Sequence, residues 1–333
     1  MRILYVTNMF PTEQKPYYGI FVKEQIEDVA QVIDLDYDVH FINAREKGPL
    51  EYLKSIFTIP RLIRREDYDL VHIHYGFSGL WRLFYKPKAK VFLSLHGADI
   101  LAEQGKGIQV AVTKRLLKKV DRVFTLNDRM DDIVRRHTDK FEMLPCAVNI
   151  NLFKPASSAE ASNHRKTIIF PSSPQVEVKD YPLFERVIAS LRQKTPYEID
   201  IKCIQNLTRQ GVSDLMSSGD CMVMTSISEG SPQVVKEALS CGLPVVSVDV
   251  GDVRSMLTGI PHCFTAESRS VEELSELVLK TFGFNRQSIR QSFINKGIYD
   301  HISITKRWVE LYHQATGKGR LSVYQRELMG TSK

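Results

Sequence analysis

The sequence has little that would mark a membrane-spanning, secreted or metal-binding protein. No apolar run approaches the roughly 20 residues that a membrane-spanning helix needs. The first ten residues become polar too soon for a signal peptide and are interpreted as a strand. Only five cysteines are present, and they form no CxxC pair and no cluster with histidine. These absences favour reduced thiols in a cytoplasmic protein and indicate no metal site.

What is present is an alternation of strand and helix patterns. The 333 residues suffice for about two domains, and 43% hydrophobic and 25% charged residues are usual for a globular fold. Residues 154–167 are rich in Ser and Ala and lack periodicity, so we interpret them as a linker, after which the alternation restarts. The pattern predicts an α/β protein with two tandem Rossmann-like, doubly wound domains and a ligand in the interdomain cleft.

The domain limits follow from this alternation. We place one Rossmann-like domain at residues 1–155 and a second at 156–300. Residues 301–333 form a helix with an apolar stripe and a basic tail, and we expect them to pack back toward the N-terminal domain.

The net charge of +6 suits an acidic partner such as a nucleotide phosphate, a nucleic acid or an anionic membrane surface. Residues 107–122 predict an amphipathic helix with a basic side that includes Lys114, Lys118 and Lys119. A solvated surface explains this side slightly better than a membrane contact does. Nucleic acid is disfavoured because no aromatic residues are interleaved with the basic ones.

The stretch SEGSPQVVKEALSCGLPVVS at 228–247 joins two apolar strand patterns through a loop and a helix. Ser231 is a candidate N-cap with Pro232 in the first helical position, and Gly242 is a candidate C-cap. A helix N-terminus favours phosphate or carboxylate binding. Glu229 and Glu237 stand on either side of it, but from the pattern alone a loop acid and a solvated helix residue are the simpler reading.

Several segments, taken in order, resemble the GT-B glycosyltransferases, and more narrowly the retaining glycosyltransferase family four of the bacterial surface-polysaccharide type. They are FPTEQKPYYGIFVKEQ, YDLVHIHYGFSG, SLHGADIL, VDRVFTLNDRM, LPCAVNINLFKP and the stretch at 228–247 with its E-x7-E pattern. The resemblance covers nearly the whole chain. It implies a nucleotide-sugar donor and a glycan or lipid-linked acceptor. The acceptor would bind to the N-terminal domain.

The resemblance also implies roles for individual residues. Glu237 would hold the ribose of the donor, Glu229 would face its sugar, and Lys179 would contact the diphosphate. The implied catalytic residues are Glu229, His96 and Lys179. The implied donor-binding residues are Gly19, Ser172, Ser173, Lys179, Glu229, Gly230, Ser231, Pro232, Gln233, Val234 and Glu237. Gly19 can equally be an ordinary glycine at a helix start.

The remaining histidines of these segments have simpler readings. His72 alternates within an apolar strand and is expected to be packed, while His74 is expected to be more open. Asp99 would either position His96 or cap the next helix.

Two departures from the family pattern concern the donor. The family usually has Gly-Arg before a Lys-Gly pair, whereas FPSSPQVEVKDYPLF supplies Lys179 without an arginine. Asn149 also stands where the family has Asp. The acidic runs at 34–36 and 67–69 are interpreted as polar turns, so we expect no metal and no cofactor, with amides and Lys179 stabilising the leaving group.

These features predict a retaining glycosyltransferase that acts by front-face displacement in cell-surface polysaccharide synthesis. We expect it in the cytoplasm, peripherally on the inner face of the membrane. A nucleotide-sugar epimerase on the same fold and a non-catalytic nucleotide-sugar-binding protein are the alternatives. A transferase, unlike an epimerase, would release nucleoside diphosphate only when an acceptor is present. A non-catalytic binding protein would bind the donor without turnover.

Overall fold

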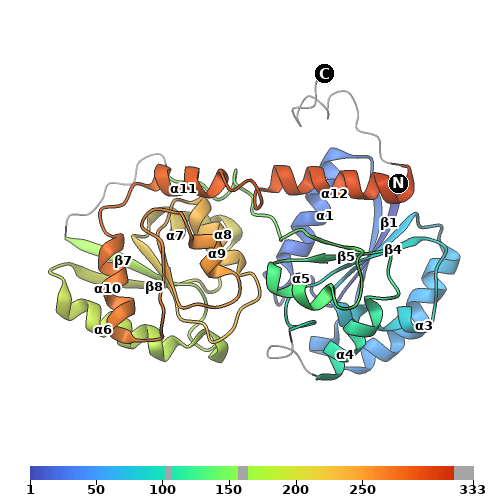
Figure 1. Ribbon diagram of the computed structural model, residues 1–333, viewed down its shortest axis with the longest axis horizontal. Coiled ribbons are helices and arrows are strands. Elements are labelled where there is room, and N and C mark those ends of the chain that lie inside the picture. Colours follow the sequence, from blue (N-terminus) through green and yellow to red (C-terminus); the bar gives the residue numbers. More distant parts are fainter. Residues whose placement is uncertain (102–106, 157–163, 319–333) are drawn as a thin grey trace, which may run out of the picture. The chain divides into compact units, whose positions relative to one another are not determined.

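The computed structural model describes residues 1–101, 107–156 and 164–318, which divide into two compact units (Figure 1). Unit 1 comprises Met1–Ala147 together with the segment from His301, and unit 2 comprises Val148–Asp300. The chain changes unit before the predicted limit at residue 155. Each unit holds one open parallel sheet with helices, so the predicted pair of Rossmann-like α/β domains is confirmed.

The sheet of unit 1 has six parallel strands in the order β2-β1-β3-β4-β5-β6. Its central strands are buried on both faces and read as continuous apolar runs, as parallel strands do. The direction of winding reverses between β1 and β3, and such a reversal marks the ligand-binding edge of an open α/β sheet. The strands are β1 (Arg2–Thr7), β2 (Asp36–Phe41), β3 (Leu70–His74), β4 (Lys90–Ser94), β5 (Arg122–Thr125) and β6 (Phe141–Met143).

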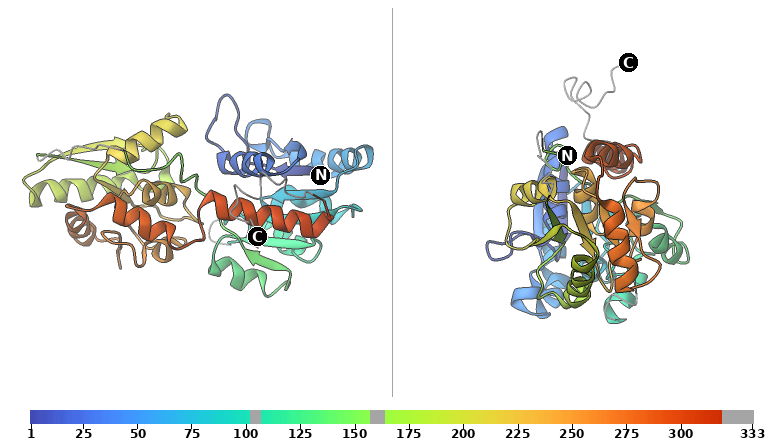
Figure 2. Two further views of the ribbon diagram at one scale, coloured as in Figure 1. Left: turned by 90° about the horizontal axis from the view of Figure 1, so that it is seen from above. Right: turned by 90° about the vertical axis from the view of Figure 1, so that its left-hand side faces the viewer.

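Helices cover this sheet, and the last of them comes from the far end of the chain. Helix α12 lies beside α1 in both Figure 1 and the left view of Figure 2. Its Trp308 and Tyr312 are buried against His72 of the sheet. The helices of unit 1 are α1 (Ile20–Val32), α2 (Ala44–Lys47), α3 (Leu50–Arg65), the 3-10 helix η1 (Gly76–Leu83), α4 (Gly107–Leu116), α5 (Asp128–Val134) and α12 (His301–Thr316).

The sheet of unit 2 has five parallel strands in the order β11-β10-β9-β7-β8, with its reversal between β7 and β9. The strands are β7 (Arg165–Phe170), β8 (Glu198–Cys203), β9 (Cys221–Met224), β10 (Val245–Ser247) and β11 (Phe264–Thr265). The helices are η2 (Glu177–Lys179), α6 (Tyr181–Lys194), α7 (Arg209–Ser218), α8 (Gln233–Ser240), α9 (Val253–Leu257), α10 (Val271–Thr281) and α11 (Arg286–Ile294).

Two local predictions from the sequence need correction. The linker does not extend to residue 167, because β7 begins at Arg165; residues 157–163 lie outside the described residues. The basic helix does not extend to residue 122 either. Helix α4 ends at Leu116, and Arg122 begins β5, where its guanidinium pairs with Glu142 at 2.5 Å. The two lysines at 118 and 119 therefore follow the helix instead of extending its basic side.

Within the described ranges, no helix is both long and apolar enough to cross a bilayer. The five cysteines of the chain are all free thiols in this structure.

Candidate functional site

The N-terminus of α8 lies at the carboxyl edge of the unit 2 sheet, next to the reversal between β7 and β9. Residues 225–232 connect the end of β9 to the helix. Pro232 is the N-cap and Ser231 makes no capping bond, so the predicted cap is shifted by one residue. At the other end Gly242 has φ 66° and Leu243 N–H donates to Ala238 O at 2.9 Å, which closes the helix as predicted. The first-turn N–H groups of α8 thus face the ligand edge.

Lys179 and Glu229 meet at this edge from two adjacent strands. Lys179 ends η2 in the loop after β7, and Glu229 lies in the loop after β9. Their Nζ and Oε1 atoms are 2.5 Å apart, and the side chains are 20% and 13% exposed. Ser172 and Ser173 belong to the same loop as Lys179, and the hydroxyl of Ser173 contacts Gln175. The two loops singled out from the sequence therefore form one site.

Backbone contacts and one arginine fix these two loops to each other. Ile227 N–H donates to Val178 O at 2.8 Å, and the Thr225 hydroxyl donates to Lys179 O at 3.0 Å. Arg269, from the loop after β11, is central to the arrangement. It donates to Ser226 O at 2.9 Å and Thr225 O at 2.8 Å, and pairs with Asp180 at 2.5 Å. Asp180 has φ 49°, an uncommon value for a residue with a side chain.

Glu237 is buried within α8 and is paired with a second cation. Its side chain is 6% exposed, and its Oε1 lies 2.6 Å from Nη1 of Arg209, the first residue of α7. The guanidinium of Arg209 lies 4.7 Å from the ring centroid of Phe153. The reading of Glu237 as a solvated helix residue is therefore wrong. Sequence reasoning missed Arg209 because it follows β8 rather than β7.

The loop after β10 supports Glu229 from another side. Gly251 has φ 60°, and a Cβ added to it would lie 2.5 Å from Gly230 O and 3.0 Å from Glu229 O. Only glycine fits this close approach without moving the loop. In the next position, burial raises the pKa of Asp252 to about 6, while the fully buried Lys236 opposes that shift.

His96 and Asp99 lie at the carboxyl edge of the sheet in unit 1. The backbone N–H of His96 donates to Asp99 Oδ1 at 3.0 Å, and Gly76 N–H donates to Asp99 Oδ2 at 2.8 Å. Burial raises the pKa of Asp99 to about 6, opposed by these N–H bonds. Asp99 thus holds the backbone of two loops in place, including the loop that carries His96.

His72 and His74 are both fully buried, so the expectation that His74 is more open is wrong. His72 contacts Tyr312 OH at 2.7 Å through Nδ1 and Ser94 Oγ at 2.8 Å through Nε2. His74 Nδ1 lies 3.2 Å from His96 Nε2. Burial, with a smaller contribution from neighbouring histidines, lowers the pKa of His72 to about 3 and that of His74 well below its usual range. Both imidazoles are therefore neutral within the core of unit 1.

Gly19 is the N-cap of α1, with φ 72°. A Cβ at this position would lie 2.3 Å from the backbone carbon of Met9. The fold of unit 1 alone therefore requires a glycine here, which supports the reading as an ordinary glycine at a helix start.

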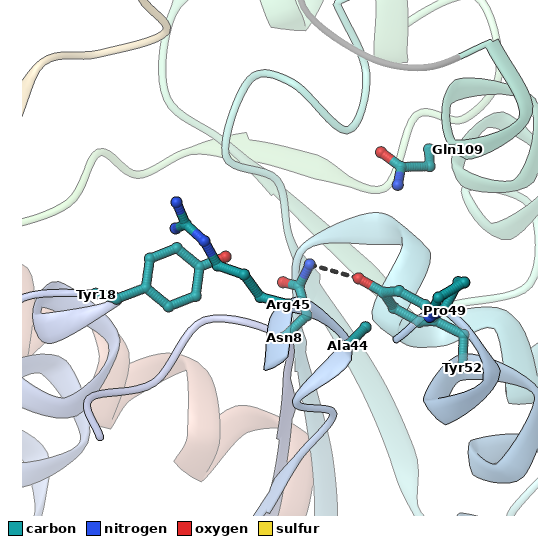
Figure 3. Close-up of a pocket in the computed structure, with 7 residues that line it drawn as sticks. All are labelled: Asn8, Tyr18, Ala44, Arg45, Pro49, Tyr52 and Gln109. Carbon is teal, nitrogen blue, oxygen red and sulfur yellow. Dashed lines mark hydrogen bonds between the residues drawn. The ribbon is translucent and has the colours of Figure 1, made fainter. Parts of the chain in front are cut away.

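A cavity of about 340 Å³ opens at the carboxyl edge of the unit 1 sheet (Figure 3). Asn8 donates through Nδ2 to Tyr52 OH at 2.7 Å, and the guanidinium of Arg45 lies 4.7 Å from the Tyr18 ring centroid. Aromatic rings and amides are groups that can stack on a sugar ring and bond to its hydroxyls. The lining residues are Asn8, Tyr18, Ala44, Arg45, Pro49, Tyr52 and Gln109.

Comparison with known families and relatives covers both units. Residues 14–127 match the family described as "Glycosyl transferase 4-like", and residues 166–282 match "Glycosyl transferases group 1". TuaC of Bacillus subtilis (strain 168), named for a glycosyltransferase role in teichuronic acid biosynthesis, is 22% identical over 94% of this chain and 98% of its own. The GPI3 subunit of a phosphatidylinositol N-acetylglucosaminyltransferase of Saccharomyces cerevisiae (strain YJM789) is 24% identical over 78% of this chain and 66% of its own.

Solved structures show the same fold at low sequence identity. Sucrose-phosphate synthase from Thermosynechococcus elongatus superposes with a TM-score of 0.75 at 15% identity, covering 94% of this chain and 98% of that one. HepE of Anabaena, in complex with UDP and glucose, has a TM-score of 0.67 at 14% identity, covering 93% and 98%.

Proposed function

Since the chain belongs to the GT-B glycosyltransferases of family four, we propose that it transfers a sugar with retention from a nucleoside-diphosphate sugar to a glycan or lipid-linked acceptor. The observation that carries this is the arrangement around α8. A helix N-terminus suited to phosphate lies between two carboxylates suited to sugar hydroxyls, and each carboxylate has its own cation, Lys179 or Arg209. The family and its relatives favour transfer over the epimerase and the non-catalytic binding protein.

The donor is assigned by the chemistry of unit 2. The diphosphate accepts from the first turn of α8 and from Lys179, while Glu237 accepts from the ribose hydroxyls. Glu229 faces the transferred sugar. The solved complexes of HepE with UDP and with UDP-glucose support a nucleoside-diphosphate sugar as the donor class.

The chemical step needs stabilisation of the charge that develops on the leaving diphosphate. Lys179 and the backbone N–H groups of Gly230, Ser231, Gln233 and Val234 supply it without a cofactor or a metal, as preorganised donors do in other enzymes. The acceptor hydroxyl attacks from the face that the diphosphate leaves, and its proton passes to the departing phosphate oxygen. This accounts for retention without a carboxylate nucleophile.

The acceptor is proposed to bind unit 1. The cavity that Tyr18 and Tyr52 line lies at the carboxyl edge of its sheet, where His96 also lies. The teichuronic acid role named for TuaC supports a cell-surface polysaccharide as the product class. We propose that the enzyme acts in the cytoplasm, peripherally at the inner face of the membrane, where a lipid-linked acceptor would be found.

The proposal is tested by a thermal-shift screen over nucleotide sugars, followed by turnover. A donor at a hundredfold excess over its Kd should stabilise the protein by about 3 kcal/mol. Nucleoside diphosphate should then be released with a lipid-linked acceptor, and the product should keep the anomeric configuration of the donor. Stabilisation by no nucleotide sugar would contradict the proposal, as would product of inverted configuration.

A further inference from the structure

A hollow of about 600 Å³ lies at the amino edge of the unit 1 sheet, opposite to the edge that carries His74 and His96. It is lined by residues 82–91, 118–121 and 140, which is to say the end of η1, the start of β4, and the residues that precede β5 and β6. These segments are distant in the sequence and meet because the strands are parallel. We call this feature the basic hollow.

Its charge is almost entirely positive. Asp121 is its one acidic residue; its Oδ2 accepts from Val91 N–H at 2.9 Å and its Oδ1 lies 3.3 Å from Lys90 Nζ. Within the described part of the chain the other lysines of the hollow form no ion pair, and they are Lys86, Lys88, Lys118, Lys119 and Lys140. Cations gathered in a concave surface raise the local concentration of anions.

One cation of the basic hollow is built into the protein rather than lying on its surface. Arg82 is only 8% exposed, and Nη1 donates to Tyr85 O at a long 3.4 Å. Its Nε is buried without a hydrogen-bond partner among the described residues. A buried charge without a full set of partners is costly. An anion in the hollow would lie beside this guanidinium and lower the electrostatic part of that cost.

Apolar side chains accompany these cations. Phe84, which lies between Arg82 and Lys86 in the sequence and lines the hollow, is 69% exposed. Nearby, the Arg64 guanidinium of α3 lies 4.7 Å from the ring centroid of Tyr85, which lines the hollow. Aromatic residues beside lysines are suited to a lipid headgroup layer, where the ring enters the interface and the cations pair with phosphates.

We propose that the basic hollow binds the phosphate groups of an anionic lipid surface, with Arg82 and the lysines as ligands and Phe84 inserted beside them. This inference rests on the proposed action at a membrane and assigns the contact to the hollow rather than to the α4 helix. It involves none of the residues assigned to the donor. Loss of membrane binding and loss of donor binding can therefore be measured separately, and either proposal can be wrong without the other.

Co-sedimentation with vesicles tests the proposal. We expect the protein to sediment at low salt with phosphatidylcholine vesicles that contain phosphatidylglycerol, and not with phosphatidylcholine alone. Lys88→Glu with Lys119→Glu should weaken the partition at least about tenfold. Lys114→Glu with Arg115→Glu on α4 is the matched control, because it makes the same change of charge outside the hollow, and it should weaken the partition about threefold at most. Phe84→Ser should weaken it without any change of charge.

Calorimetry with nucleoside diphosphate shows whether each variant keeps a folded donor site, and we expect unchanged affinity in all of them. Three results would overturn the proposal. One is wild-type protein that does not sediment with the anionic vesicles, whether or not it binds single-stranded nucleic acid. Another is equal weakening by the α4 control pair. The third is thermal stabilisation of the protein by inorganic phosphate without any binding to vesicles, which would make the hollow a site for free anions.

Discussion

Lys179 Nζ and Glu229 Oε1 lie 2.5 Å apart at the edge of the unit 2 sheet, so the two charged groups assigned to the donor neutralise each other in this structure. A bound diphosphate would take the place of the carboxylate as the partner of Lys179. Glu229 would then be released toward the donor sugar. The ion pair thus keeps both side chains in place before the donor arrives.

Replacing Lys179 should weaken donor binding through the diphosphate. Lys179→Gln removes a charge-assisted contact, so the affinity for nucleoside diphosphate should fall by about 1–3 kcal/mol in calorimetry. Lys194→Gln is the matched control, because Lys194 is also paired at 2.5 Å with a glutamate, Glu272 of α10, but at the C-terminal end of α6. Equal losses in the two variants would remove the role given to Lys179.

Arg269 should act as a positioning residue, because it ties together the loops of Lys179 and Glu229. Arg269→Lys keeps the charge but cannot reach all three acceptors, and we expect kcat to fall about tenfold through displacement of these loops. Steady-state assays with saturating donor measure this. The control Arg254→Lys alters an exposed arginine that pairs with Asp249 and Glu267. Equal activity in the Arg269 variant and the wild type would show that the loops need no such tie.

Gly251 should matter for activity beyond its backbone angle. Gly251→Ala would place a Cβ against the carbonyl oxygens of Gly230 and Glu229, so turnover should fall at least about tenfold. Gly283→Ala is the control, since Gly283 has φ 81° but open space around its Cβ position. Gly283→Ala should lose about 1 kcal/mol of stability in chemical denaturation because of the left-handed backbone, and Gly251→Ala should lose more because its loop must also move. Normal turnover in the Gly251 variant would contradict the close packing described for this loop.

The two sheets and the loops of Lys179 and Glu229 could be predicted from the sequence because they depend on local patterns. Strand and helix periods, and a proline and a glycine at the ends of α8, act within a few residues. Arg209 and Arg269 could not be predicted, since they reach the site from loops after other strands. The burial of His74 likewise depends on tertiary packing, and the contact of α12 with the sheet beside it joins segments more than 200 residues apart.

The buried histidines should make the protein sensitive to acid. His72 has a folded-state pKa of about 3, below its unfolded value of about 6.5, so the unfolded chain binds more protons as the pH falls. Stability is therefore lost as the pH falls below about 6.5. His72→Gln should reduce the slope of unfolding free energy against pH by about 1.4 kcal/mol per pH unit in that range. Denaturation at a series of pH values measures the slope. An unchanged slope would mean that His72 is not neutral in the folded protein.

Calorimetric titration of nucleoside diphosphate into Glu237→Gln and Glu229→Gln tests the roles of the two carboxylates most directly. If Glu237 binds the ribose, its variant should lose about 1–3 kcal/mol of nucleotide affinity, because a neutral amide accepts a weaker hydrogen bond than a carboxylate. If Glu229 faces the sugar, its variant should bind the free nucleotide almost as the wild type does and lose turnover instead. Equal loss of nucleotide affinity in both variants would contradict the separate roles given to the two carboxylates, and no loss in either would contradict the assignment of both residues to the donor site.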